Sequence, residues 1–155
     1  MDPLWIKFLH ILGAVVLFGT GLGTAFQMWA AHRAPDVRVL ARVTRQVVWA
    51  DWLFTTPAVF VQPLSGLWLI YEAGYELTEG WVLWALVLFV AAGLCWLPVV
   101  ALQMRMANIA EAAAQAGADL PALYFKLYRC WFILGWPAFA ALLGVFYLMI
   151  FKPDL

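Results

Sequence analysis

Charged residues are scarce in this sequence, and four long stretches contain none. Only 12% of the 155 residues are Asp, Glu, Lys or Arg, and 66% are apolar, whereas soluble domains are about 25% charged and about 45–50% apolar. The uncharged stretches hold 25, 20, 25 and 22 residues, at positions 8–32, 52–71, 80–104 and 130–151. A helix of about 20 apolar residues crosses the hydrocarbon of a bilayer. The composition therefore excludes a soluble domain and predicts four membrane-spanning helices.

These stretches predict one transmembrane domain over residues 1–155, an all-α, integral membrane four-helix up-down bundle. We expect spans near residues 5–31, 50–71, 80–104 and 130–151, because hydrocarbon offers the backbone no hydrogen-bond partner outside a helix. The first apolar run is longer than the core of a signal peptide, so we expect it to remain as a span. No linker or second domain is visible in the composition.

The basic residues are unevenly distributed along the chain. Seven of the nine lie in the connections 33–50 and 105–129, whereas the connection 71–80 has three Glu and no basic residue. Cytoplasmic connections carry the excess of Lys and Arg. We therefore expect a bacterial inner membrane protein with both termini in the periplasm and the lipid bilayer as its partner. The net charge of zero excludes the basic excess of a nucleic-acid-binding protein.

Helix ends can be predicted from capping residues. Asp36 is expected to cap a helix that starts before the second span, and Gly117 to end the third. Asp119, just before a proline, is expected to cap the fourth. His32, beside Arg33, stands at the boundary of the first span, where we expect a solvated imidazole.

Recognisable catalytic motifs are absent. The sequence has no HExxH, no Ser-His-Asp candidate and no phosphate loop, and its two Cys are not in a CxxC pattern. No catalytic residue is predicted, and whether the protein is an enzyme stays open. Gly19 and Gly23 have the small-xxx-small spacing that lets membrane helices approach closely. We expect them to pack against a helix, and they would also permit a homo-oligomer.

His10 is the ionisable residue of the first span. At 100° per residue it shares a helix face with the small or apolar residues Ala14, Leu17 and Gly21, and ionisable groups in spans usually face the bundle. A neutral imidazole beside small residues suits an axial ligand of haem iron. The alternative is a histidine that is hydrogen-bonded near the outer interface.

Three prolines indicate a second candidate site at the cytoplasmic side. Pro57, Pro98 and Pro137 lie in three different spans, and each frees a carbonyl four residues earlier. Such carbonyls are tolerated only where they are buried or line a cavity. With Gln103 at a similar depth, they predict a polar pocket that opens to the cytoplasm. Three kinks filled by neighbouring side chains are the alternative.

Two further polar residues are expected to belong to this pocket region. Asp51 ends the second span, where an ion pair with Arg45, Arg105 or Arg129 or a role in proton transfer would explain it. Gln62 stands near mid-membrane before Pro63. We expect it to point inward, where its amide would bond a free carbonyl such as that of Val59.

Several segments carry a resemblance to known families. The chain contains LWIKFLHILGAVVLFGTGLGTAFQMWAAHR, ADWLFTTPAVFVQPLSGL, CWLPVVALQMRM and WFILGWPAFAALLGVF. Over nearly its whole length it resembles a bacterial family of four-helix membrane proteins of unknown function. More distantly it resembles the HemJ-type protoporphyrinogen oxidases, which bind haem b, and the copper-resistance D membrane domains. The features shared with the HemJ type are Trp5, Lys7 and His10, the GLWL at 66–69, and a terminal Lys-Pro.

The HemJ resemblance implies that His10 is a haem ligand. It implies no more than this, because the third span lacks the His and Lys of HemJ-type proteins. The first hypothesis is a b-type haem redox protein that exchanges electrons with a quinone or a partner protein. The second is a cofactor-free accessory or small transporter-like membrane protein that uses the cytoplasm-facing polar pocket.

Overall fold

The computed structural model describes residues 2–33 and 36–155, and all regular structure in this part of the chain is helical. The helices are α1 (Pro3–Ala31), α2 (Val37–Ala50), the π-helix η1 (Asp51–Thr55), α3 (Thr56–Ala73), α4 (Gly80–Ala116) and α5 (Ala122–Phe151). Because α2, η1 and α3 follow one another without a break, the described residues form four helices long and apolar enough to cross a membrane. The all-α, four-helix fold is confirmed.

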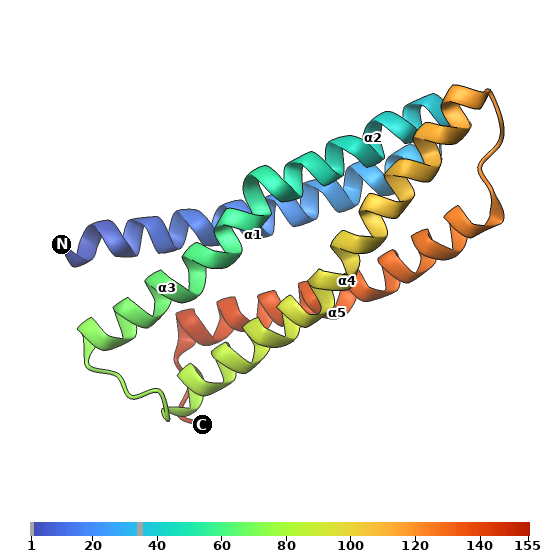
Figure 1. Ribbon diagram of the computed structural model, residues 1–155. Coiled ribbons are helices and arrows are strands. Elements are labelled where there is room, and N and C mark those ends of the chain that lie inside the picture. The colour runs from blue at the N-terminus through green and yellow to red at the C-terminus, as the bar shows by residue number, and fades with distance from the viewer. Residues whose placement is uncertain (1, 34–35) are drawn as a thin grey trace.

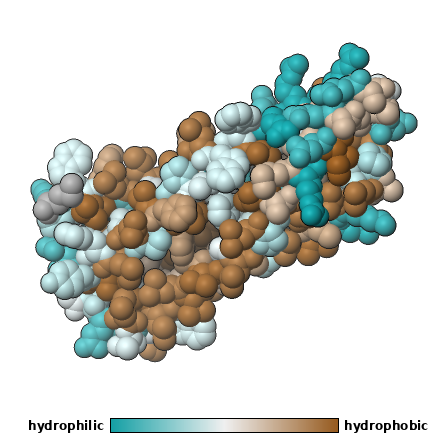
Figure 2. Space-filling view, viewed as in Figure 1, coloured by the Kyte–Doolittle hydropathy of each residue, from teal (hydrophilic) through white to brown (hydrophobic). Residues whose placement is uncertain are grey.

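The helices run alternately up and down, and both termini lie at one end of the molecule (Figure 1). We call this end the terminal end. The opposite end holds α2, the C-terminal part of α4 and the start of α5, and hydrophilic side chains gather over it in Figure 2. We call it the basic end, because it carries seven of the nine basic residues: Arg33, Arg38, Arg42, Arg45, Arg105, Lys126 and Arg129.

Two of the predicted helix ends are confirmed and one is wrong. The Asp36 side chain accepts a hydrogen bond from the Arg38 backbone N–H at 2.8 Å and caps α2. Gly117 ends α4 at a φ of 61°, which suits a residue without Cβ. Asp119 does not cap α5. The N-cap is Pro121, and the helix starts at Ala122, so the Asp119 carboxylate precedes the cap by two residues.

Buried side chains are concentrated at the basic end. Since α4 has 37 residues and each adds about 1.5 Å, it is about 55 Å long and projects well beyond a hydrocarbon layer of about 30 Å. Around its C-terminal half, Met28, Met106, Ala110 and Tyr124 are fully buried in one core with α2. Burying apolar surface stabilises a protein where that surface would otherwise contact water, but stabilises it little where the surface would otherwise contact lipid. The spans accordingly leave many large apolar side chains exposed.

The expectation that His32 is solvated is wrong, because its imidazole is half-buried. Its Nδ1 lies 2.6 Å from the Met28 carbonyl, to which it donates, and its ring stacks on Tyr128 with centroids 3.6 Å apart. Burial lowers the pKa of His32 below its usual range, and the bond to Met28 opposes this shift. The imidazole is therefore part of the aromatic packing between α1 and α5.

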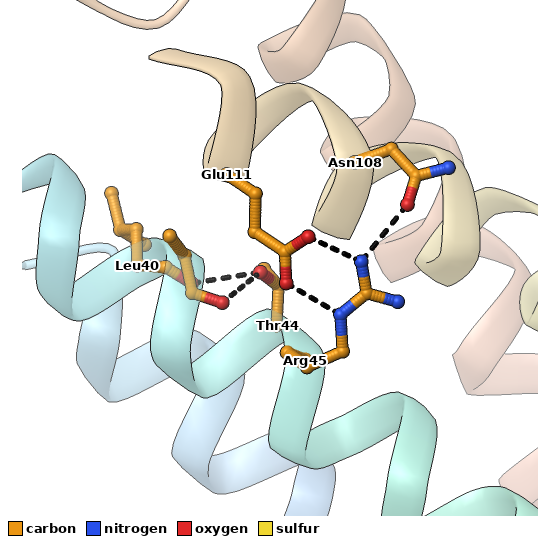
Figure 3. Close-up of polar contacts among 6 residues, drawn as sticks. Leu40, Thr44, Arg45, Asn108 and Glu111 are labelled. Atoms are coloured by element: carbon orange, nitrogen blue, oxygen red, sulfur yellow. Dashed lines mark hydrogen bonds and ion pairs between the residues drawn. The ribbon is translucent and has the colours of Figure 1, made fainter. Parts of the chain in front are cut away.

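An ion pair joins α2 to α4 at the basic end. Arg45 donates through Nε and Nη2 to the two carboxylate oxygens of Glu111, and Nη2 also donates to Asn108 Oδ1 at 3.0 Å (Figure 3). Two hydrogen bonds between one guanidinium and one carboxylate fix the relative orientation of the two side chains. Both side chains are about one-third exposed, however, and water weakens the attraction.

We expect Arg45→Ala to lower the free energy of unfolding by about 0.5–1 kcal/mol, the range of partly exposed ion pairs. Urea unfolding in detergent, followed by Trp fluorescence, measures this. The matched control is Arg42→Ala, because Arg42 is exposed and has no ion pair within the described residues. A loss above 2 kcal/mol for Arg45→Ala alone would contradict the estimate.

The expected packing of Gly19 and Gly23 is not found within the chain. A Cβ built on either residue has no heavy atom of the described residues within 4 Å. Close helix approach occurs instead at Gly13 and Gly66, where α1 meets α3. The small-xxx-small spacing therefore lies on an open face of α1.

Candidate functional site

A cavity of about 370 Å³ lies between α1, the η1–α3 segment, α4 and α5. This volume falls within the range of small-molecule sites. Its walls are mostly aromatic and aliphatic, with Phe89 and Trp96 on α4 and Phe139 on α5. Gly93 and Gly135 also line it, and a Cβ on either one would meet only open space within 4 Å. The helices thus leave a half-open hollow that their own side chains do not fill.

Four buried polar residues gather at the end of the cavity that is nearer the basic end. They are exposed by 7% or less and come from three helical segments: Thr24 from α1, Asp51 and Thr55 from η1, and Gln103 from α4. Thr55 Oγ1 donates to Asp51 Oδ1 at 2.7 Å, and the Gln103 amide lies beside the Asp51 carboxyl. Thr24 Oγ1 instead donates to the Thr20 carbonyl at 2.8 Å. Of the residues predicted for a polar pocket, Asp51 and Gln103 therefore line this cavity, whose walls are otherwise mostly apolar.

The π-helix places Asp51 on the cavity wall. Pro57 has no N–H to donate to the preceding turn, so the regular ladder cannot continue through it. Over residues 51–55 the backbone widens instead, and the Thr56 N–H reaches the Asp51 carbonyl. Asp51 and Thr55 are then buried together while Trp52 is 55% exposed. Such π-turns occur frequently at functional sites.

The three prolines do not line the pocket, contrary to prediction. Pro57, Pro98 and Pro137 are all exposed and none contacts the cavity. The three prolines therefore do not form part of the cavity wall.

The predicted ion pair of Asp51 is also wrong. The ion pair found among the described residues joins Arg45 to Glu111. Arg105 is exposed and does not line the cavity. No Lys or Arg is among the residues that line the cavity, so the Asp51 carboxyl has no basic partner there.

Three residues that line the cavity each carry a buried polar atom without a hydrogen-bond partner within the described residues. The atoms are Gln103 Oε1, which is an acceptor, and the indole N–H groups of Trp96 and Trp131. A buried polar group without a partner costs about 1–3 kcal/mol. These atoms thus mark the polar part of an otherwise apolar cavity wall.

The sequence pointed to Gln103 and Asp51 but not to Trp96 or Trp131. The ten tryptophans are numerous enough to be assigned generally to the membrane interface. A signal was available in the spacing of α4, because Phe89, Gly93, Trp96 and Gln103 fall on one helical face. Small, aromatic and polar residues on one face of a span indicate a cavity wall.

His10 lies away from this cavity, in the contact between α1 and α3. Its Nδ1 is 2.8 Å from Ser65 Oγ. Because the Ser65 hydroxyl donates to the Val61 carbonyl at 2.6 Å, it accepts from His10 Nδ1–H, which leaves the lone pair on Nε2. A Cβ on Gly66 would lie 3.2 Å from His10 Cε1. The imidazole is thus held by α3 at Nδ1.

Gln62 joins the same contact, with a different partner from the one expected. Its Nε2 donates to the His10 carbonyl at 2.8 Å, so the amide bridges α3 to α1 and does not serve the Val59 carbonyl. Of the residues predicted to surround a haem with His10, Leu17 and Gly21 line the cavity, whereas Ala14 and His10 itself do not. The residues predicted to surround a haem therefore lie in two separate places, some at the cavity and His10 in the contact between α1 and α3.

Any space for a haem beside His10 is separate from this cavity, because the cavity does not extend to the imidazole. Among the described residues, no group of three or more His, Cys, Asp or Glu side chains could hold a metal ion. Haem iron takes only one or two axial ligands from a protein, so this absence concerns bare metal ions.

The fold and the cavity together define an integral membrane protein of four helical spans. The chain belongs to the DUF2269 family of predicted integral membrane proteins, whose profile matches residues 4–153. No curated protein and no solved structure matches it. The resemblance to a four-helix membrane family of unknown function is thereby confirmed. The similarity to the HemJ type is not shown.

Proposed function

We propose that this protein binds an amphipathic small molecule in the cavity between its spans, as a small transporter-like or accessory protein of a bacterial inner membrane. The observation that carries the proposal is that the residues lining one aromatic-walled cavity include a buried carboxyl group and three side chains with an unpartnered polar atom. By the distribution of basic residues, the polar end of the cavity lies toward the cytoplasm and both termini lie in the periplasm.

The division of the cavity into two parts favours this class of guest. An apolar body would contact Phe89, Phe139 and the open space at Gly93 and Gly135, where aromatic surface is available. A polar head would lie at Asp51 and Gln103. Few but well-placed polar groups in an apolar pocket are typical of small-molecule sites.

The proposal is tested by filling the cavity. In Gly93→Leu, the new side chain occupies open space, so the protein should fold with an unchanged or higher thermal midpoint and lose its binding capacity. The probe is 4-phenylbutanol, titrated into the protein in lipid nanodiscs and followed by quenching of Trp fluorescence. We expect saturable binding by the unchanged protein and at least a ten-fold weaker response from Gly93→Leu.

The matched control is Gly19→Leu, which also adds a side chain to open space but does not line the cavity. It should bind the probe like the unchanged protein and report any effect of partitioning into lipid. Equal responses from the two glycine variants would overturn the proposal.

Haem b at His10 remains a prediction and forms the second candidate. The observation in its favour is the Ser65 bond that fixes the proton on Nδ1 and leaves Nε2 able to coordinate iron. The test is a reduced-minus-oxidised absorption spectrum of the purified protein expressed with added haem. A Soret difference lost in His10→Ala would support it, and a flat spectrum would contradict it. The predicted exchange with a quinone or redox partner depends on the same result.

A further inference from the structure

The chemical identity of the polar head can be argued from the charges around Asp51. This residue is 4% exposed, and no Lys, Arg or His is among the residues that line the cavity with it. Arg45, the basic residue closest to it in sequence, is engaged with Glu111. A buried carboxylate is costly unless it is paired or neutralised. The chain itself therefore supplies no counter-charge at this wall.

The polar groups that contact the carboxyl group carry no charge. Thr55 Oγ1 donates to Oδ1, and the Gln103 amide is the second hydrogen-bond partner of the carboxyl group. On the neighbouring wall, Gln103 is 3% exposed and its Oε1 is buried without a partner. An acidic group without a counter-charge and an unpartnered amide oxygen thus belong to two residues that line the same end of the cavity. A guest with two or more N–H or O–H donors would complement both.

The aromatic walls of the cavity narrow the chemical class of the guest further. Trp96 and Trp131 line the cavity with Gln103 and Asp51. Aromatic faces, of which Trp is best, attract cations, and the attraction increases where water is excluded. The apolar remainder of the cavity, about 370 Å³ in all, is far larger than a bare metal ion occupies and offers such an ion few oxygen ligands. An organic cation would contact both the acidic end and the apolar part of the cavity.

Resting on the function proposed above, we infer that the guest is a primary or secondary organic ammonium ion with an apolar body. Its N–H groups donate to Asp51 and Gln103 Oε1, and its positive charge is the missing partner of the Asp51 carboxylate. Charge-assisted hydrogen bonds of this kind are about twice as strong as neutral ones. The site therefore prefers an ammonium ion to an alcohol of the same shape.

The test compares two probes of one skeleton, 4-phenylbutylammonium and 4-phenylbutanol, in lipid nanodiscs. The unchanged protein should bind the ammonium ion at least ten-fold more tightly than the alcohol. Asp51→Asn, which keeps the shape and removes the charge, should abolish this preference by weakening the ammonium ion at least ten-fold and the alcohol less than three-fold. Gly93→Leu should lose both probes.

A second variant covers the case in which Asp51→Asn does not fold. Gln103→Leu removes the unpartnered acceptor and leaves the sequence of η1 unchanged, and it should weaken binding of the ammonium ion at least three-fold more than binding of the alcohol. If both probes bind equally and Asp51→Asn changes neither, the inference fails while the cavity proposal stands. If neither probe responds to Gly93→Leu, the cavity proposal fails. If NaCl displaces the ammonium ion at millimolar concentration while choline chloride does not, the site belongs to a metal cation and the inference is overturned.

Discussion

Replacing Met106 by alanine is expected to lower the free energy of unfolding by about 2–5 kcal/mol, the range for removing a fully buried large apolar side chain. Met106 has no exposed surface and packs in the core that joins α2 and α4 to α1 and α5 at the basic end. The remaining cavity cannot collapse easily, because its neighbours belong to different helices. Urea unfolding in detergent, followed by Trp fluorescence, measures the loss.

Met104→Ala provides the matched control. Met104 lies two residues earlier in α4 and is 37% exposed, so its removal should change the free energy of unfolding by about 0.5 kcal/mol or less. Comparable losses in the two variants would show that the core of the basic end is not the part that stabilises the fold.

The core of the basic end also supports the proposed site. Val99 and Trp131 belong to that core and line the cavity as well. A loosened core would therefore displace the wall that carries Trp131. We expect Met106→Ala to bind 4-phenylbutylammonium more weakly even at temperatures where it is folded.

Replacing Gly13 by leucine is expected to produce the second large loss. A Cβ on Gly13 would overlap with Gln62 Nε2, so the amide must leave the His10 carbonyl to which it donates. Overpacking costs about 1–3 kcal/mol, and a buried polar group left without a partner costs about 1–3 kcal/mol more. The sum, about 2–6 kcal/mol, should appear in the same unfolding experiment.

Gly19→Leu is again the appropriate control, since a Cβ there meets only open space. It should leave the stability within about 0.5 kcal/mol. Because α1 and α3 meet at Gly13 and Gly66, the double variant Gly13→Leu, Gln62→Ala should recover part of the loss. The absence of any recovery would contradict the proposed clash.

The amino-acid sequence by itself determined the class of this protein. Four stretches without charge left the backbone no alternative to helices in hydrocarbon, and these are the four helices of the structure. Asp36 and Gly117 also marked helix ends correctly, because capping depends on neighbouring backbone groups alone. The burial of Asp51, Gln62 and Gln103 could be anticipated, since polar groups in a span avoid lipid.

Only the tertiary structure decided what these residues contact. The helical period gives the face on which a residue lies but not the helix that it meets, so Gln62 was expected at Val59 and is bonded to His10. The prediction that the three prolines line a pocket failed for the same reason, since the sequence does not show which side of its helix a freed carbonyl faces. Asp51 reaches the cavity wall through a π-helix, which a proline alone does not specify, because Pro98 and Pro137 lie within α-helices. The cavity lies between residues of four helical segments, and the pattern within one helix does not show which other helices complete its walls.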